Sequence, residues 1–156
     1  EMDCVVGSSL TTLLVLSERK TRKEIILRIP NKTTKSVVHA LNTLEKNYGK
    51  RFSKIFRSIT VDNGVEFSDC SGMEESIFGG TRTMLYYCHP YTSCERGTNE
   101  RLNRDIRKIF PKGTDFAKVT DKQVKRCEDW VNHYPREIFD FGNSAERFEE
   151  ELAKIA

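Results

Sequence analysis

Residues 3–29 read DCVVGSSLTTLLVLSERKTRKEIILRI and contain three apolar stretches separated by short polar connections. The stretches are Asp3–Val6, Leu10–Leu16 and Lys23–Ile29, and the last of them stops at a proline. They are rich in the β-branched residues that favour strands, and short polar connections are typical of hairpins. We therefore expect three consecutive strands that form an antiparallel meander.

Beyond Pro30 the spacing of apolar residues changes to that of helices. The spacing predicts a helix over residues 34–48, which begins after an N-cap at Thr33 or Thr34 and ends at Gly49. The other expected elements are strands at 55–61 and 83–88, one or two helical turns within 73–78, and helices from Thr98 to Pro111, from Asp121 to Tyr134 and from Ser144 to Ile155. This order predicts an α/β fold with a five-stranded mixed sheet, three antiparallel strands and then two parallel ones, flanked by helices.

The bulk properties predict a soluble protein of one domain over residues 1–156. The sequence has no apolar run near the roughly 18 residues that cross a bilayer and no secretory signal, so we expect a cytoplasmic protein without a membrane partner. The net charge is only +3, but residues 96–112 are strongly basic and residues 146–151 are acidic. This uneven distribution indicates one face that binds a polyanion.

The cysteine pattern indicates free thiols. The chain has five cysteines, an odd number, and no CxxC spacing, which is typical of reduced thiols in a cytosolic protein. Cys88, His89 and Cys94 raise the alternative of a zinc site, but their spacing does not match the common ligand patterns.

Two aspartates lie beside apolar strands. Asp3 adjoins the first stretch, and Asp62 ends the strand expected at 55–61. A charge buried at such a position costs several kcal/mol unless it is paired or bound to a metal ion. The alternative for Asp3 is an ordinary residue at a strand edge. The alternative for Asp62-Asn63-Gly64 is a tight hairpin turn, because Asn-Gly favours positive φ.

A third carboxylate begins the helix expected from Thr98. One polar face of this helix has residues at positions i, i+3, i+4, i+7 and i+8, namely Glu100, Asn103, Arg104, Arg107 and Lys108. One interpretation is a solvated face on which Glu100 pairs with Arg104. The other is that Glu100 converges with Asp3 and Asp62 on Mg²⁺ or Mn²⁺, which prefer oxygen ligands, while the cations behind it hold a phosphate backbone.

A family resemblance favours the second interpretation. Residues 91–100 (YTSCERGTNE), Asn103 and residues 110–116 (FPKGTDF) resemble the signature of the IS-thirty family of bacterial insertion-sequence transposases. Residues 18–22 (ERKTR) and 60–67 (TVDNGVEF) match the same family in the same order. The resemblance covers nearly the whole chain. It implies an integrase-type catalytic core with a ribonuclease H-like fold, and it implies that Asp3, Asp62 and Glu100 are the DDE triad.

The resemblance also implies an activity and partners. We expect a transposase that performs metal-dependent cleavage and strand transfer of DNA, with two Mg²⁺ (or Mn²⁺) ions when DNA is bound. The expected partners are transposon ends, target DNA and further copies of the chain, at the bacterial nucleoid. The DNA-binding helix-turn-helix segments that precede the core in family members are absent from these 156 residues. The residues expected to bind DNA are Arg96, Asn103, Arg104, Arg107 and Lys108, and Glu66 is interpreted as a supporting residue.

Some positions depart from the family pattern. Met2 stands where the family usually has glycine, and Cys94 stands where it usually has tryptophan. The late Asn-x-x-Pro-Arg motif is present at 132–136, but residues 140–145, which follow it, are unusual. Two alternatives therefore stay open: another ribonuclease H-like nuclease, or a domesticated copy that binds DNA without catalysis.

Overall fold

The computed structural model describes residues 1–89 and 97–155, without the side chains at positions 97, 98 and 100. The strands are β1 (Met2–Val6), β2 (Thr12–Ser17), β3 (Glu24–Ile29), β4 (Ser58–Val61) and β5 (Met84–Tyr87). Strands β1, β2 and β3 pair antiparallel in that order, and β4 pairs parallel with β5. The expected meander and the expected parallel pair are therefore both confirmed.

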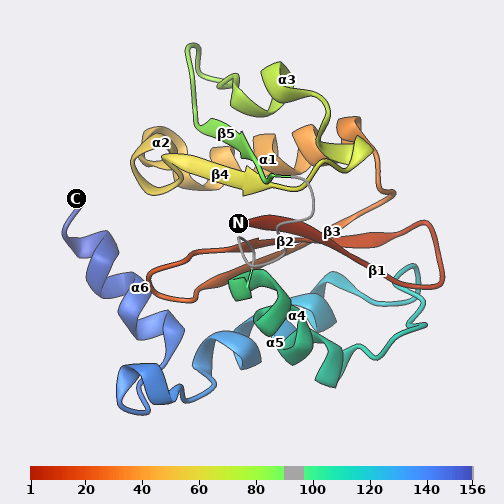
Figure 1. Ribbon diagram of the computed structural model, residues 1–156, viewed down its shortest axis with the longest axis vertical. Coiled ribbons are helices and arrows are strands. Elements are labelled where there is room, and N and C mark those ends of the chain that lie inside the picture. The colour runs from red at the N-terminus through yellow and green to blue at the C-terminus, as the bar shows by residue number, and fades with distance from the viewer. Residues whose placement is uncertain (90–96, 156) are drawn as a thin grey trace.

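Helices lie on both sides of this arrangement (Figure 1). They are α1 (Thr34–Tyr48), α2 (Phe52–Ile55), α3 (Cys70–Glu74), α4 (Gly97–Ile109), α5 (Asp121–His133) and α6 (Ser144–Ala153), with short 3-10 turns η1 (Gly49–Arg51), η2 (Val65–Phe67) and η4 (Glu137–Phe139). In Figure 1, α1, α3, β4 and β5 lie above the three-stranded sheet, α4 and α5 lie below it, and α6 rises beside its left end. The structure therefore has the expected α/β architecture.

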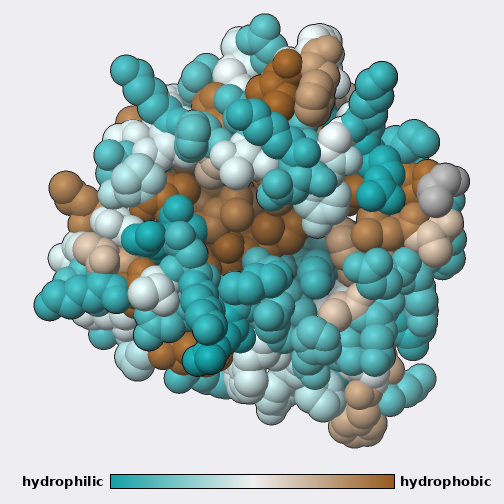
Figure 2. All heavy atoms as spheres, turned by 180° about the vertical axis from the view of Figure 1, so that it is seen from behind, coloured by the Kyte–Doolittle hydropathy of each residue, from teal (hydrophilic) through white to brown (hydrophobic). Residues whose placement is uncertain are grey.

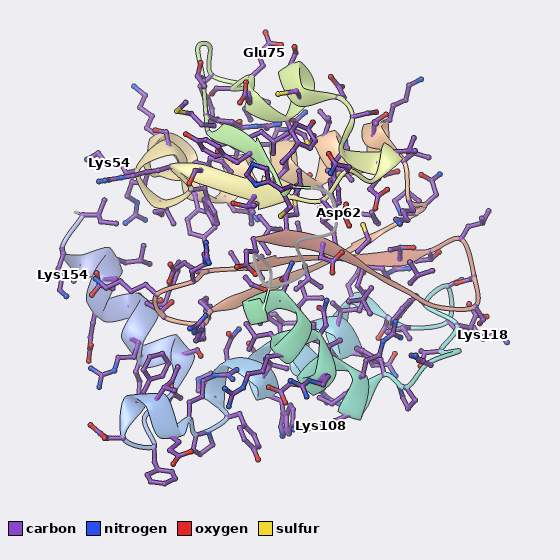
Figure 3. The ribbon with its side chains drawn as sticks, in the orientation of Figure 1. Lys54, Asp62, Glu75, Lys108, Lys118 and Lys154 are labelled. Carbon is purple, nitrogen blue, oxygen red and sulfur yellow. The ribbon has the colours of Figure 1, made fainter. Side chains whose placement is uncertain are left out.

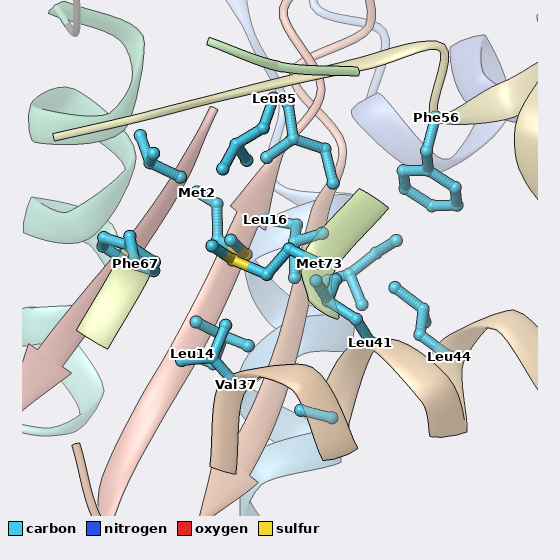
Figure 4. Packing of buried hydrophobic residues seen from close by; sticks show 14 of the residues in the cluster. Met2, Leu14, Leu16, Val37, Leu41, Leu44, Phe56, Phe67, Met73 and Leu85 are labelled. Carbon is cyan, nitrogen blue, oxygen red and sulfur yellow. The ribbon is translucent and has the colours of Figure 1, made fainter. Parts of the chain in front are cut away.

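Strand β2 is the centre of the fold, because all of its residues are buried. Its side chains alternate between two cores, as a strand's geometry requires. Leu14 and Leu16 pack into the core shared with α1, α3, β4 and β5 (Figure 4). Leu13 and Val15 pack into a second core shared with α4 and α5. One strand thus joins the two halves of the molecule.

The helix boundaries follow local capping. The Thr33 side chain accepts a hydrogen bond from Ser36 N, so Thr33 is the N-cap of α1, and Gly49 ends the helix with φ +58°, where a side chain would be strained. The last helix is capped by Asn143, not by a side chain within it. Thr120 and Gln123 form a reciprocal capping box at the start of α5.

Two local expectations were wrong. The strand expected at 55–61 begins only at Ser58, because Phe52–Ile55 forms the helical turn α2. Phe52 is buried and its ring stacks on Phe56 at a centroid distance of 4.5 Å, so packing decides this segment. The hairpin considered at Asp62-Asn63-Gly64 does not form, since Gly64 is extended and leads into η2.

The outer edge of β3 is partly covered by α5. Glu128 accepts the backbone N–H of Ile26 at 2.8 Å, and Asn132 bonds both the N–H and the carbonyl of Glu24 at 2.8 Å. A groove of about 700 Å³ lies along β3 between α1 and α5. Figure 2, which shows the molecule from behind, has hydrophobic side chains gathered in a hollow on that face. Through these hydrogen bonds from Glu128 and Asn132, α5 satisfies backbone groups of β3 that an edge strand would otherwise expose.

The motif at 110–116 has a structural role. Phe116 is fully buried, and its ring meets Phe110 edge-on at 5.7 Å. The backbone at Thr114 passes so close to Gly7 that a Cβ on residue 7 would lie 2.1 Å from Thr114 O. Ser8 N donates a hydrogen bond to the same carbonyl at 3.0 Å. The motif thus fixes the connection after α4 against the end of β1. No helix among the described residues is long and apolar enough to cross a membrane.

We predict that Leu14→Ala lowers the free energy of unfolding by about 2–5 kcal/mol, because the truncation leaves a cavity in the central strand. Denaturant titration measures the change. The matched control is Leu10→Ala, since Leu10 lies outside β2 and is 83% exposed. Its cost should be within about 0.5 kcal/mol of zero. Equal costs for the two variants would show that β2 is not the central packing element.

Candidate active site

Asp3 joins β1 to α4. It is half-buried in β1. Its Oδ1 accepts the backbone N–H of Cys4 at 2.8 Å, and its Oδ2 accepts a hydrogen bond from the Nδ2 of Asn103 at 3.0 Å. Asn103 therefore orients this carboxylate, and the contact ties the first acidic residue to the helix that carries the third.

Asp62 lies at the carboxyl end of β4, and Figure 3 shows it between β4 and β1. Its Oδ1 accepts the backbone N–H of Gly64 at 2.9 Å. A Cβ on Gly64 would lie 2.8 Å from that oxygen and 2.6 Å from an oxygen of Glu66. The two carboxylates are thus close neighbours, and residue 64 must lack a side chain for both to hold their positions.

Glu66 is buried, with 5% of its surface exposed, and it has a cationic partner. Lys32 Nζ lies 2.9 Å from its Oε1. This hydrogen bond raises the pKa of Lys32, so the lysine stays charged. The ion pair offsets one of the negative charges beside Asp62. The sequence carries no signal for Lys32, because nothing in its local context indicates an acidic partner 34 positions later.

Cys4 connects these groups electrostatically. Burial raises the pKa of its thiol to about 12, and the negative charges of Glu66, Asp3 and Asp62 act in the same direction. The thiol therefore stays protonated at neutral pH. Each of these carboxylates lies near enough to the thiol to act on it, and β1, which carries Asp3, lies against β4, which ends at Asp62.

The third acidic residue falls partly outside the described residues. Position 100 lies on α4 one turn before Asn103, but the Glu100 side chain is outside the described part of the chain, as is the whole of Arg96. Among the described side chains, no three His, Cys, Asp or Glu groups are arranged to hold a metal ion. Convergence of Glu100 with Asp3 and Asp62 stays a prediction.

Polar contacts hold the start of α4 against the sheet. Asn99 is buried, and its backbone N–H donates to Glu1 Oε2 at 2.9 Å. The Ser17 hydroxyl donates to its Oδ1 at 2.5 Å. These contacts come from the residue next to position 100. They fix the helix start relative to β1 and β2, and no local pattern in the sequence indicates them.

The polar residues of α4 diverge to two sides. Asn103 bonds Asp3, and Arg107 donates to the carbonyl of Val6 at 2.8 Å, so both lie toward β1. Arg104 and Lys108 line a cavity on the other side, and Lys108 pairs with Asp105 at 2.7 Å. Of the residues expected to bind DNA, the four that the structure describes therefore occupy two neighbouring surfaces and not one.

Comparisons with known proteins show which sequences and which fold this chain is similar to. No family model matches the chain. The transposase of insertion sequence element IS4351 of Bacteroides fragilis is 32% identical over 155 residues, which is 96% of this chain and 44% of that protein. Transposase InsI of insertion sequence element IS30C of Escherichia coli is 32% identical over 153 residues, 98% of this chain and 38% of that protein. The chain spans less than half the length of these curated relatives.

A solved structure has the same fold. The catalytic core domain of BIV integrase superposes with a TM-score of 0.67 and 17% sequence identity, over 99% of this chain and 96% of that one. The superposition confirms the expected fold class, an integrase-type core.

Glu24 is a further buried acid, on β3 beside Asn132 of α5. It is fully buried in β3, and burial raises the pKa of its carboxyl to about 8, with the Arg136 charge opposing this. The folded chain therefore keeps a proton on Glu24 that the unfolded chain loses near the ordinary value of 4.5. As the pH rises from about 4.5 to 8, the unfolded state is increasingly favoured.

We predict that Glu24→Gln removes this pH dependence. Between pH 5 and pH 8 the free energy of unfolding of the parent should fall relative to that of the variant, at a slope of up to roughly 1.4 kcal/mol per pH unit. Denaturant titrations at several pH values measure the slope. Exposed Glu149→Gln is the control and should leave it unchanged. Parallel stability curves for the parent and Glu24→Gln would contradict a protonated Glu24.

Proposed function

We propose that this chain, which is related over nearly its whole length to the IS30-type transposases and has the fold of an integrase catalytic core, is the DDE catalytic core of a transposase. The observation that carries the proposal is the position of Asp3 on β1, where it accepts a hydrogen bond from Asn103 of α4, with Asp62 at the end of β4, the strand that lies against β1. The activity would be cleavage of DNA strands at the ends of a mobile element and their joining to target DNA.

Asp3, Asp62 and Glu100 would hold Mg²⁺ or Mn²⁺, two ions when DNA is bound. The donor set fits, because the described ligands are carboxylates, the oxygen donors that such ions prefer. Bound ions of this kind activate a water nucleophile and stabilise the attacking and leaving oxygens of an in-line displacement. The oxygen atoms available to them are already oriented by Asn103 Nδ2 and the N–H groups of Cys4 and Gly64.

The chain's own residues would prepare the site for the ions. Asn103 and Gly64 hold the two aspartates in fixed orientations, which reduces the reorganisation needed on binding. Lys32 neutralises Glu66, so the excess negative charge facing the ions belongs to the triad. Asn99 positions the helix start that carries Glu100.

The partners follow from this chemistry. DNA would be bound through its phosphates by cations of α4, and the reaction on two element ends implies more than one copy in the active complex. Such a protein would act at the bacterial nucleoid.

We predict that Asp62→Asn lowers the rate of DNA cleavage by roughly a thousandfold or more, as removal of a catalytic group does in other enzymes. The fold should persist, because the asparagine Oδ1 can still accept the Gly64 N–H. The assay incubates the full-length protein that contains this chain with its element ends and Mg²⁺, and scores cleaved and joined strands.

Asp69→Asn is the matched control, since Asp69 is an exposed N-cap of α3 and asparagine caps equally well. It should keep full activity. Full activity in Asp62→Asn would refute the proposed role. Cleavage without joining in the parent would indicate a nuclease, and a chain that binds DNA but never cleaves would indicate a domesticated copy.

We also predict that Arg104→Ala weakens DNA binding similarly for element-end and scrambled duplexes. For each phosphate that the protein no longer neutralises, the slope of log K against log salt should flatten by about 0.9. Fluorescence anisotropy at several salt concentrations measures this. Arg51→Ala, at an exposed arginine of η1, is the control. A strong preference for the element end that Arg104→Ala removes would show that this helix reads sequence.

A further inference from the structure

A cavity of about 720 Å³ lies beside α4, on the side away from Asp3. One wall is α4, starting at Arg101, the residue that follows position 100. The other wall is the segment from Tyr134 to Phe141, which follows α5. In Figure 3, Lys108 marks this lower side of α4, whereas Asp62 lies above the helix. The cavity therefore begins next to the proposed catalytic site and leads away from it.

The α4 wall carries a row of cations. Arg101, Arg104 and Lys108 are exposed at positions i, i+3 and i+7 of α4, and Arg22 lies at the same cavity. Like charges at this spacing repel one another on a helix. Lys108 is offset by Asp105 at 2.7 Å, but Asp105 also pairs with Arg136 at 3.6 Å. The wall thus keeps an excess of positive charge, which a bound anion would relieve.

The opposite wall presents aromatic rings. Tyr134 is 43% exposed, and its ring lies 5.2 Å from that of Trp130. Lys108 Nζ lies 5.3 Å from the Tyr134 ring centre and 6.0 Å from the Trp130 ring centre. Phe141 at the rim is 73% exposed. Exposed rings beside a row of cations form the combination that binds single-stranded nucleic acid, where cations track the backbone and rings stack on bases.

The segment holding Phe141 is unusual and rigidly built. Asp140 and Phe141 both have positive φ, 51° and 64°, which is uncommon for residues with side chains. Backbone hydrogen bonds from Phe141 N to Arg136 O and from Arg136 N to Gly142 O, each 3.0 Å, close the turn. Buried Arg136 anchors it through Ser144 Oγ at 2.9 Å and Val131 O at 3.1 Å. The turn keeps a large apolar ring in solvent at the cavity rim, where it needs a partner.

We propose that this cavity binds an unpaired DNA strand next to the cleavage site, with phosphates on Arg101 and Arg104 and a base stacked on Tyr134 or Phe141. The inference rests on the proposed function for the identity of the strand as DNA. An unpaired strand fits better than a duplex, because bases within a duplex do not present their faces to side chains. In this proposal, the motif at 132–136 and the unusual residues after it form one wall of the DNA-strand site.

Trp130 is the only tryptophan of the chain, and its ring lies 5.2 Å from that of Tyr134, which lines the cavity, so its fluorescence reports on a change beside the cavity. The chain is titrated in EDTA with a single strand of about ten thymidines and with a blunt duplex of equal length. We expect the single strand to quench Trp130 emission and the duplex to bind with a much smaller change. Phe141→Ala and Tyr134→Ala should weaken single-strand binding by roughly 5- to 100-fold and duplex binding by less than about 2-fold.

Phe78→Ala is the matched control, because Phe78 is 57% exposed and lies outside the cavity. It should change neither affinity. Thermal melting checks the fold of each variant. If Tyr134→Ala unfolds, the exposed Phe141 still decides the question. The proposal is overturned by equal effects on both DNA forms, by no effect of Phe141→Ala, or by dimerisation that Phe141→Ala abolishes and DNA does not alter.

The failure of this inference is distinct from failure of the proposed function. Binding is measured without divalent ions, so it does not depend on the cleavage step. Quenching in a protein that never cleaves DNA would refute the catalytic proposal alone. Cleavage that depends on Asp62, without preferential single-strand quenching, would refute the cavity proposal alone.

Discussion

Strand β2 has no exposed side chain, and this burial on both faces is the constraint on which the molecule depends. A strand covered on both sides must alternate between two separate apolar cores, and Leu14 and Val15 do so. Because β2 is fixed in this way, its neighbour β1 is fixed in register, with Asp3 opposite Val15. The backbone position of the first acidic residue therefore follows from hydrophobic packing, whereas its hydrogen bonds with Cys4 and Asn103 orient the carboxylate.

Helix α4 turns this fixed sheet into a site. Its apolar stripe includes buried Leu102 and Ile106, of which Ile106 packs into the second core, and the rest of its surface is divided into two polar sides. One side meets Asp3 through Asn103, and the other carries Arg101 and Arg104 along the cavity. A helix of thirteen residues can in this way orient the proposed catalytic carboxylate on one side and present the cations of the proposed DNA-strand site on the other.

The carboxylates of Asp3, Asp62 and Glu66 repel one another electrostatically, and neighbouring groups reduce this unfavourable energy. Lys32 and several N–H donors compensate for part of this repulsion. The remaining negative charge is a property that a site for divalent cations needs. Glu24, buried on β3 beside α5, avoids an equivalent cost by holding its proton. Two buried acids of this chain are thus stabilised differently. Glu66 is paired with the cation of Lys32, whereas Glu24 is neutral because it keeps its proton.

The sequence by itself determined what depends on neighbours along the chain. The spacing of apolar residues predicted the meander and α1, and Thr33 and Gly49 predicted the ends of that helix, because period and capping are local properties. Asp62 could be placed at the end of a strand for the same reason. Only the tertiary structure decided that Phe52–Ile55 is helical, that Glu66 lies beside Asp62 with Lys32 as its partner, and that Arg104 and Arg107 point to different surfaces. These features depend on contacts between residues far apart in the chain. The sequence around each residue does not show which distant residue it will meet, so such contacts are decided only when the chain folds.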